Sequence, residues 1–195
     1  MKNKVIFTSL LFFAANAYSQ PGSKIKFGIK LGIALAKSKL EYPDNASYKF
    51  QTKSRLIAGG YVDFGINKEV VFQPALLYVR KGVRESTQSQ YNYGSNVLFN
   101  YLEIPLNILY SAPAKKGNYF IGGGLSPAIK LNNYLYGDEL KSVDLGVNLL
   151  AGYKFSVGFS INIGYTYGLL NVSNNKEYAS KIQNKYFSLA AGYEF

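Results

Sequence analysis

The 195-residue sequence contains no cysteine and no histidine. Without cysteine the chain forms no disulfide and no thiolate metal site, and it has no residue for lipid attachment at a lipoprotein cleavage site. Without histidine the Ser-His-Asp and Cys-His arrangements of hydrolases, and most transition-metal sites, are excluded. We therefore expect a protein that is not an enzyme and that has no catalytic centre, no metal site and no cofactor.

Long hydrophobic runs are scarce as well. Residues 1–4 carry two lysines and residues 5–15 form an apolar run, but a membrane-spanning helix needs about 20 apolar residues and no later segment supplies them. A short charged start followed by a short apolar run is typical of a secretory signal peptide. The chain is therefore expected to be exported.

The cleavage site of this signal peptide is expected just before Gln20. Ala17 and Ser19 place small residues at the two positions that signal peptidase reads. We therefore expect a signal peptide at residues 1–19 and one domain at residues 20–195, with cleavage after Ala17 as the alternative.

Acidic residues are few, with 11 against 22 Lys and Arg, which gives a formal net charge of +11. A basic balance can indicate nucleic acid, but these charges are concentrated between the apolar segments and belong to no recognition motif. Anionic lipid headgroups fit the excess at least as well. We expect no nucleic-acid partner.

What the sequence does contain is period-two alternation, the pattern of β-strands with two different faces. From Phe159 to Leu169 the odd positions are apolar or aromatic and the even positions are small or polar. Similar alternation runs through residues 27–35, 143–155 and 187–195, and less regular segments cover residues 56–66, 71–81, 98–110 and 119–131.

The connections between these eight segments alternate in length. The short ones are residues 67–70, 111–118 and 156–158, and the long polar ones are residues 37–55, 82–97, 132–142 and 171–184. Short periplasmic turns and long outer loops are typical of membrane barrels. The pattern predicts an all-β fold, an eight-stranded antiparallel up-and-down transmembrane β-barrel. Pro74, Pro105 and Pro127 fall inside three strands, where we expect local bulges.

The face made of small and polar residues is expected to line the lumen. It is rich in glycine, a poor solvent surface for strands, and eight strands leave only enough space inside for side chains. The alternative is a soluble, lipocalin-like carrier of apolar ligands, which would turn its apolar face inward.

Charges on the lumen face are balanced, with four lysines and four acids. Because buried charges must be paired, we expect a structural charge network that plugs the lumen, with Lys30 paired to Glu103 at mid-height. The network comprises Lys26, Lys30, Asp63, Glu103, Lys130, Asp144, Lys154 and Glu194.

Each strand also carries an aromatic residue on its apolar face near the short-turn end. Aromatic rings favour the boundary between water and lipid, so the set is expected to form a periplasmic aromatic girdle. Its members are Phe27, Phe64, Phe72, Tyr110, Tyr119, Phe155, Phe159 and Phe195. The terminal Phe195 also resembles the signal read by the barrel-assembly machinery, which is an expected partner during insertion.

Several motifs, in order along the chain, resemble the PorT-like outer-membrane β-barrel family of Bacteroidetes. They are Phe27-Gly28-Ile29-Lys30-Leu31-Gly32, Gln73-Pro74-Ala75-Leu76-Leu77-Tyr78, Tyr101-Leu102-Glu103-Ile104-Pro105-Leu106, Tyr119-Phe120-Ile121-Gly122-Gly123-Gly124, Tyr165-Thr166-Tyr167-Gly168-Leu169 and Gly192-Tyr193-Glu194-Phe195. One departure is Ala75, where the family usually has glutamate. The resemblance implies an outer-membrane barrel, and its one specific role would be as an accessory component of type IX protein secretion.

The sequence thus favours a non-enzymatic barrel in the outer membrane of a Gram-negative envelope, serving envelope structure or interaction. Its expected partners are outer-membrane lipid and lipopolysaccharide, with a protein partner possible at the extracellular loops. An accessory role in protein export and the soluble carrier are the alternatives.

Overall fold

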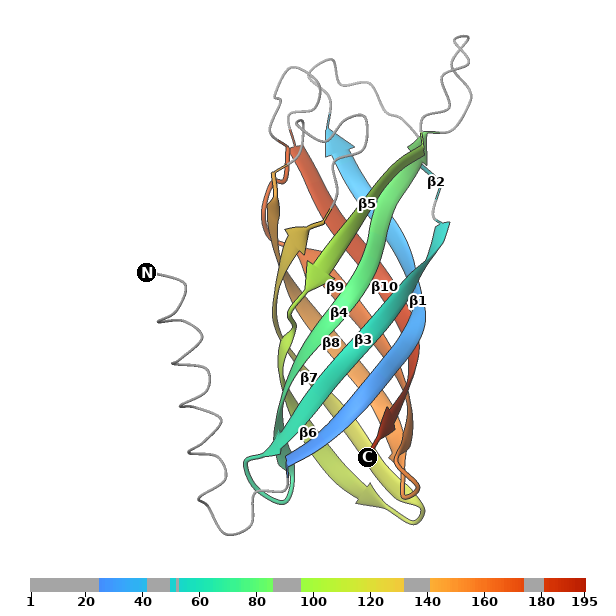
Figure 1. Ribbon diagram of the computed structural model, residues 1–195, viewed down its shortest axis with the longest axis vertical. Helices are drawn as coiled ribbons and strands as arrows, with labels where there is room; N and C mark the ends of the chain where they lie inside the picture. Colours follow the sequence, from blue (N-terminus) through green and yellow to red (C-terminus); the bar gives the residue numbers. More distant parts are fainter. Residues whose placement is uncertain (1–24, 42–49, 52, 86–95, 132–140, 174–180) are drawn as a thin grey trace.

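Strands dominate the computed structural model, which describes residues 25–41, 50–51, 53–85, 96–131, 141–173 and 181–195 (Figure 1). The strands are β1 (Ile25–Glu41), β2 (Phe50–Gln51), β3 (Lys53–Gly65), β4 (Val70–Glu85), β5 (Asn96–Glu103), β6 (Leu106–Ala114), β7 (Gly117–Lys130), β8 (Val143–Phe155), β9 (Phe159–Gly168) and β10 (Lys181–Glu194). Within these residues no helix is long and apolar enough to cross a membrane.

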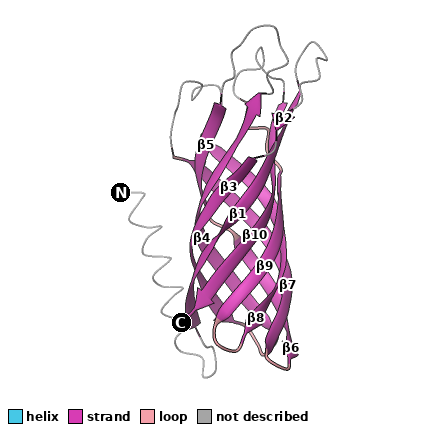
Figure 2. Cartoon of the chain, turned by 90° about the vertical axis from the view of Figure 1, so that its right-hand side faces the viewer, coloured by secondary structure: helices cyan, strands magenta, loops and turns pink. Residues whose placement is uncertain are grey.

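The ten segments form the eight strands of one closed antiparallel barrel. β2 and β3 both pair with β4, and β5 and β6 both pair with β4 and β7, so each couple makes one barrel strand. The first and last strands, β1 and β10, pair over Gly28 to Glu41 and close the barrel. Figures 1 and 2 show the crossing front and back walls.

The registers fix the tilt of the strands. A path from residue to paired residue around the barrel starts at Ile25 and returns to β1 at Leu35, ten residues farther on. It passes through Phe64, Phe72, Ile108, Gly123, Leu149, Tyr165 and Phe187. A closed sheet with such a stagger must have strongly tilted strands, as Figure 1 shows.

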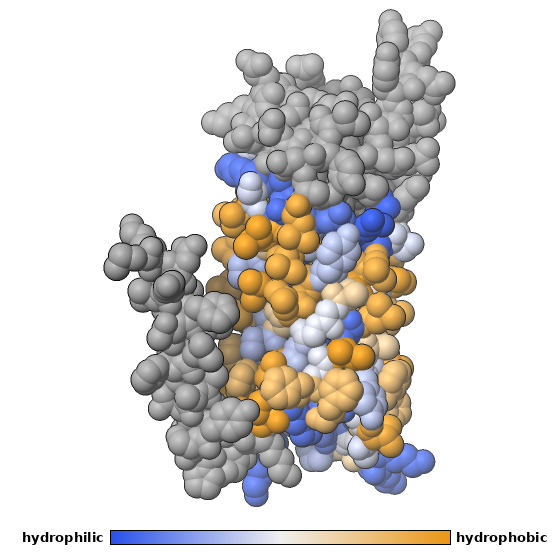
Figure 3. Space-filling model, in the orientation of Figure 1, coloured by the Kyte–Doolittle hydropathy of each residue, from blue (hydrophilic) through white to orange (hydrophobic). Residues whose placement is uncertain are grey.

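The apolar face of the strands points outward. In β9 the odd residues Phe159 to Tyr167 are 38–49% exposed, whereas Ser160 and Asn162 on the other face are 5–6% exposed. The outward apolar side chains form a belt, orange in Figure 3, which we call the apolar belt. Such a surface suits lipid rather than water. The alternative of a soluble carrier, which needs an inward apolar face, is therefore not favoured.

The predicted bulges at the prolines are wrong too. Registers do not shift at Pro74, Pro105 or Pro127, although the ladders are interrupted there and β5 is separated from β6. Neighbouring bonds keep the strands aligned: the Ala75 N–H donates to the Pro105 carbonyl at 2.9 Å, and the Ile104 N–H donates to the Pro127 carbonyl at 2.8 Å. Proline therefore removes a donor here without inserting a residue.

Several strands are longer than the alternation predicted. β1 continues to Glu41, β4 to Glu85, and β10 begins at Lys181. These extensions are polar and basic, so they carry no apolar alternation. Strand pairing needs only backbone hydrogen bonds, and it therefore extends past the apolar belt.

Candidate functional site: a filled lumen inside an apolar belt

Four charged side chains meet inside the barrel at the end formed by the short turns 66–69, 115–116 and 156–158. We call Lys26, Asp63, Lys154 and Glu194 the basal charge cluster. Lys154 Nζ lies 3.0 Å from Asp63 Oδ2 and 2.6 Å from Glu194 Oε2. Lys26 Nζ lies 2.6 Å from Glu194 Oε1, and Gln73 Nε2 donates to Asp63 Oδ1 at 2.7 Å. Every oxygen of the two buried carboxylates thus accepts a hydrogen bond, as buried charges require.

Lys30 and Glu103 do not form the pair that the sequence suggested. The Lys30 ammonium lies 5.8 Å from the centre of the Tyr61 ring. The fully buried Glu103 accepts a hydrogen bond from the Tyr186 hydroxyl at 2.6 Å. Residues at equal distances from the ends of their strands lie at different heights in the barrel, because the strands are staggered by ten residues around it.

Glu103 instead belongs with the charges nearer the long connections. Ala128 of β7 stands opposite Glu103 on one side and Asp144 on the other, and Lys130 follows two residues later on the same face. All three charged residues are buried, and Asn184 Nδ2 donates to Asp144 Oδ2 at 2.9 Å. The eight predicted charges therefore divide into a basal group with Lys30 nearby and this second group.

Uncharged polar residues also line the lumen, and they were not among the predicted lumen residues. Besides Gln73, Asn184 and Tyr186, the Asn148 amide donates to Asn107 Oδ1 at 2.7 Å. Each lies on the inward face of its strand, so the same alternation that located the charges could have located them.

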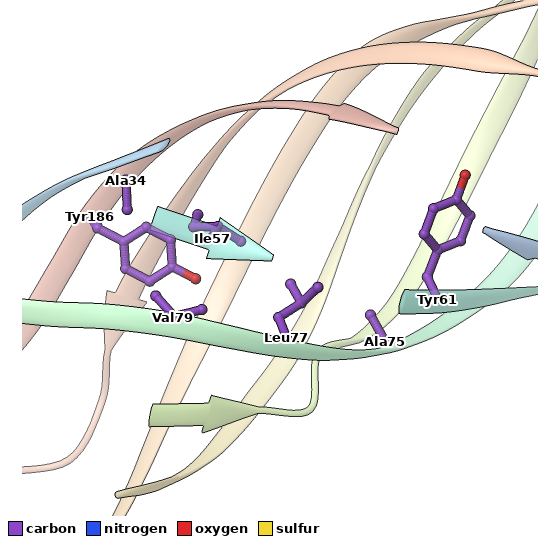
Figure 4. Close-up of a cluster of buried hydrophobic side chains, with 7 residues drawn as sticks. All are labelled: Ala34, Ile57, Tyr61, Ala75, Leu77, Val79 and Tyr186. Carbon is purple, nitrogen blue, oxygen red and sulfur yellow. The ribbon is translucent and has the colours of Figure 1, made fainter. Parts of the chain in front are cut away.

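An apolar group inside the lumen was also not predicted. It consists of Ala34, Ile57, Tyr61, Ala75, Leu77, Val79 and Tyr186, and Figure 4 shows these side chains gathered on the inner side of the wall. In β4 both faces are apolar, because Leu77 and Val79 point inward while Leu76 points outward. This explains why the alternation of β4 looked irregular.

Among the described residues, side chains fill most of the lumen. A cavity beside Lys30 and Asp63 measures about 30 Å³, and another, beside Pro105 and Asn107, measures about 40 Å³. Each is large enough for only one or a few water molecules. A wider cavity of about 520 Å³ opens at the short-turn mouth, next to Lys26 and Glu194.

The aromatic residues of the predicted girdle all lie near the short-turn end of the barrel. Ring contacts join Phe64 to Phe72 with centroids 6.1 Å apart, and Phe155 to Phe159 at 5.9 Å. Tyr153 extends the set, with its ring 4.9 Å from Tyr119 and 4.8 Å from Phe155. A role of these rings at the membrane interface stays a prediction.

Comparison with known proteins agrees with this geometry. The family model described as "Outer membrane protein beta-barrel domain" matches residues 14–174, which include β1 to β9. The chain belongs to this family. The family assignment and the outward apolar belt together place the protein in the outer membrane. No curated protein matches the sequence.

Solved barrels share the fold of this family member. The neisserial surface protein NspA aligns with 90% of this chain and 100% of its own, with a TM-score of 0.55 and 16% identity. The outer membrane protein OprG of Pseudomonas aeruginosa aligns with 89% of this chain and 97% of its own, with a TM-score of 0.50 and 14% identity. The outer membrane protein AlkL, whose structure was determined in lipid bilayers, aligns with 91% of this chain and 93% of its own, with a TM-score of 0.50 and 14% identity.

These likenesses concern the fold alone. The matched family is broader than the PorT-like family of Bacteroidetes, so that resemblance and the secretion role it implies stay predictions. The expected signal peptide lies outside the described residues.

Proposed function

We propose that the protein is a non-enzymatic, sealed outer-membrane barrel that serves envelope structure or interaction through its four long outer connections. The observation that carries this proposal is the filled lumen inside an apolar belt: the wall suits lipid, and the cavities beside Lys30 and Pro105 hold at most a few water molecules. The absence of histidine and cysteine supports the non-enzymatic assignment.

The proposal includes the route and the partners. The chain is exported with a signal peptide, inserted by the barrel-assembly machinery, and surrounded by outer-membrane lipid, including lipopolysaccharide. The long connections face outward and offer the surface for a protein or polymer partner. The basic excess of the chain supports anionic partners.

Membrane integration can be tested on isolated outer membranes. We expect the protein to resist carbonate extraction and to migrate faster on gels before boiling than after it, because a closed barrel satisfies its backbone hydrogen bonds internally. Recovery of the chain in the soluble periplasmic fraction, with no effect of boiling, would contradict the proposal.

The sealed lumen can be tested in planar bilayers. We expect no sustained ion conductance from the purified barrel, because the charge cluster and the apolar group fill the interior. A porin inserted under the same conditions is the positive control. Stable ohmic channels from this protein would show a continuous water-filled path and replace the structural role with a transport role.

A further inference from the structure

The outer border of the apolar belt, toward the long connections, begins with cations on β10 and on β4, two strands that β1 and β3 separate. The outward residues of β10 are apolar from Tyr193 to Phe187, and the next one is Lys185. On β4 the outward Leu76 is followed by Tyr78 and then by the exposed Arg80. The first charge beyond the belt is therefore positive on both strands.

Lys185 is held at the barrel surface by an aromatic ring. It pairs directly with Tyr167 of β9, and its ammonium lies 4.3 Å from the centre of that ring. On its other side the register places Lys37 of β1 directly opposite.

A second concentration of positive charge lies on β3 and β4, which are two and three strands away from β10. Arg55 of β3 and Arg80 of β4 lie close enough for their like charges to interact, and the buried Arg55 Nε has no hydrogen-bond partner. Asn100 Oδ1 accepts from Arg80 Nε at 3.2 Å. That bond orients the guanidinium and leaves its two terminal amino groups for another acceptor.

We propose that this border binds phosphate groups of the lipid headgroups in the outer leaflet, with Lys185 and Arg80 as the principal contacts. The inference rests on the proposed function, because it requires the long connections to face outward. The occupants are phosphorylated glycolipids of the lipopolysaccharide type. One lies at each cation, with its acyl chains on the apolar belt beside Phe187 or Leu76 and a phosphate at the level of the cation. Arg and Lys are the residues that recognise phosphate.

The test uses the full mature barrel in zwitterionic detergent, titrated with bisphosphorylated lipid A and followed by native mass spectrometry. One basic side chain near an anionic surface contributes about 1 kcal/mol, so Lys185→Gln and Arg80→Gln should each weaken lipid binding at their own position about fivefold, and the double variant should weaken binding at both positions. Lys185→Arg should retain binding. The matched control, Lys115→Gln with Lys116→Gln, removes two exposed charges at the opposite end and should leave binding unchanged.

Two further titrations identify the ligand. Dephosphorylated lipid A should bind at least tenfold more weakly, and phosphatidylglycerol should bind more weakly than lipid A. Equal affinity for phosphatidylglycerol, or equal losses in the control variant, would overturn the inference and indicate general attraction of anionic lipid. Each variant is first checked for the faster band of the folded barrel on unboiled gels. Absence of that band from the wild type contradicts the proposed function, whereas its presence with unchanged lipid binding contradicts this inference alone.

Discussion

Replacing Lys154 by methionine should lower the free energy of unfolding by about 3 kcal/mol, the low end of what removal of one partner of a buried ion pair costs. Lys154 is the one ammonium that contacts both carboxylates of the basal charge cluster, and both carboxylates have only 5% of their side-chain surface exposed. Without it, Asp63 keeps only the amide of Gln73, and Glu194 keeps only Lys26. Equilibrium urea unfolding in lipid vesicles measures the change.

Two further variants distinguish loss of this bridge from loss of charge in general. Lys26→Met removes the same charge from the same cluster, but the Lys26 side chain is 46% exposed, so the cost should stay below about 1 kcal/mol. Adding Asp63→Asn to Lys154→Met should recover much of the loss, because one buried negative charge disappears. Equal destabilisation by the two lysine substitutions would contradict this account of the cluster.

A second large effect is expected at neighbouring glycines of β3. A Cβ at Gly59 would fall on the carbonyl oxygen of Leu76, whereas a Cβ at Gly60 would have as its nearest atom the Gly28 carbonyl oxygen at 3.4 Å. Gly59→Ala should therefore cost about 3 kcal/mol or prevent folding, and Gly60→Ala should cost less than about 1 kcal/mol. The fraction of folded barrel on unboiled gels and urea unfolding report both outcomes.

The glycine pair is its own matched control, since the two substitutions are identical and differ only in the face of the strand. Gly59 lies on the lumen side, where the tightly curved wall brings β4 close, and Gly60 lies on the outer side. If Gly60→Ala proved as damaging as Gly59→Ala, backbone flexibility rather than close approach would explain the need for glycine.

The fold could be predicted because the lipid-facing and lumen-facing residues of a membrane barrel alternate along each strand with a period of two. In β9 each outward residue is apolar or aromatic and each inward residue is small or polar, so the sequence indicated both the strand limits and the outward face. In β4 the inward Leu77 and Val79 belong to the apolar group, and the pattern there became ambiguous. Polar strand extensions such as residues 37–41 carried no hydropathy signal at all.

The candidate site could be predicted only in part, for a geometrical reason. The alternation of odd and even positions along a strand predicts that Lys154 and Glu194 point inward. Their contacts, however, depend on the register and on the stagger of the closed sheet. Neither quantity is visible in single strands. Glu103 therefore received the wrong partner, although its inward position was right. Hydrogen bonds from Gln73 and Asn184 did not follow from the balance of formal charges, because both side chains are neutral amides.

The three prolines have a mechanical consequence for the barrel. Pro74, Pro105 and Pro127 lie within one residue of each other's register positions on adjacent barrel strands, and each lacks the N–H that would complete a cross-strand pair. The wall is therefore not elastically uniform. Lateral pressure from the surrounding bilayer should deform it first along this line through β4, the junction of β5 and β6, and β7, while the continuous β1–β10 ladder acts as the stiff opposite side.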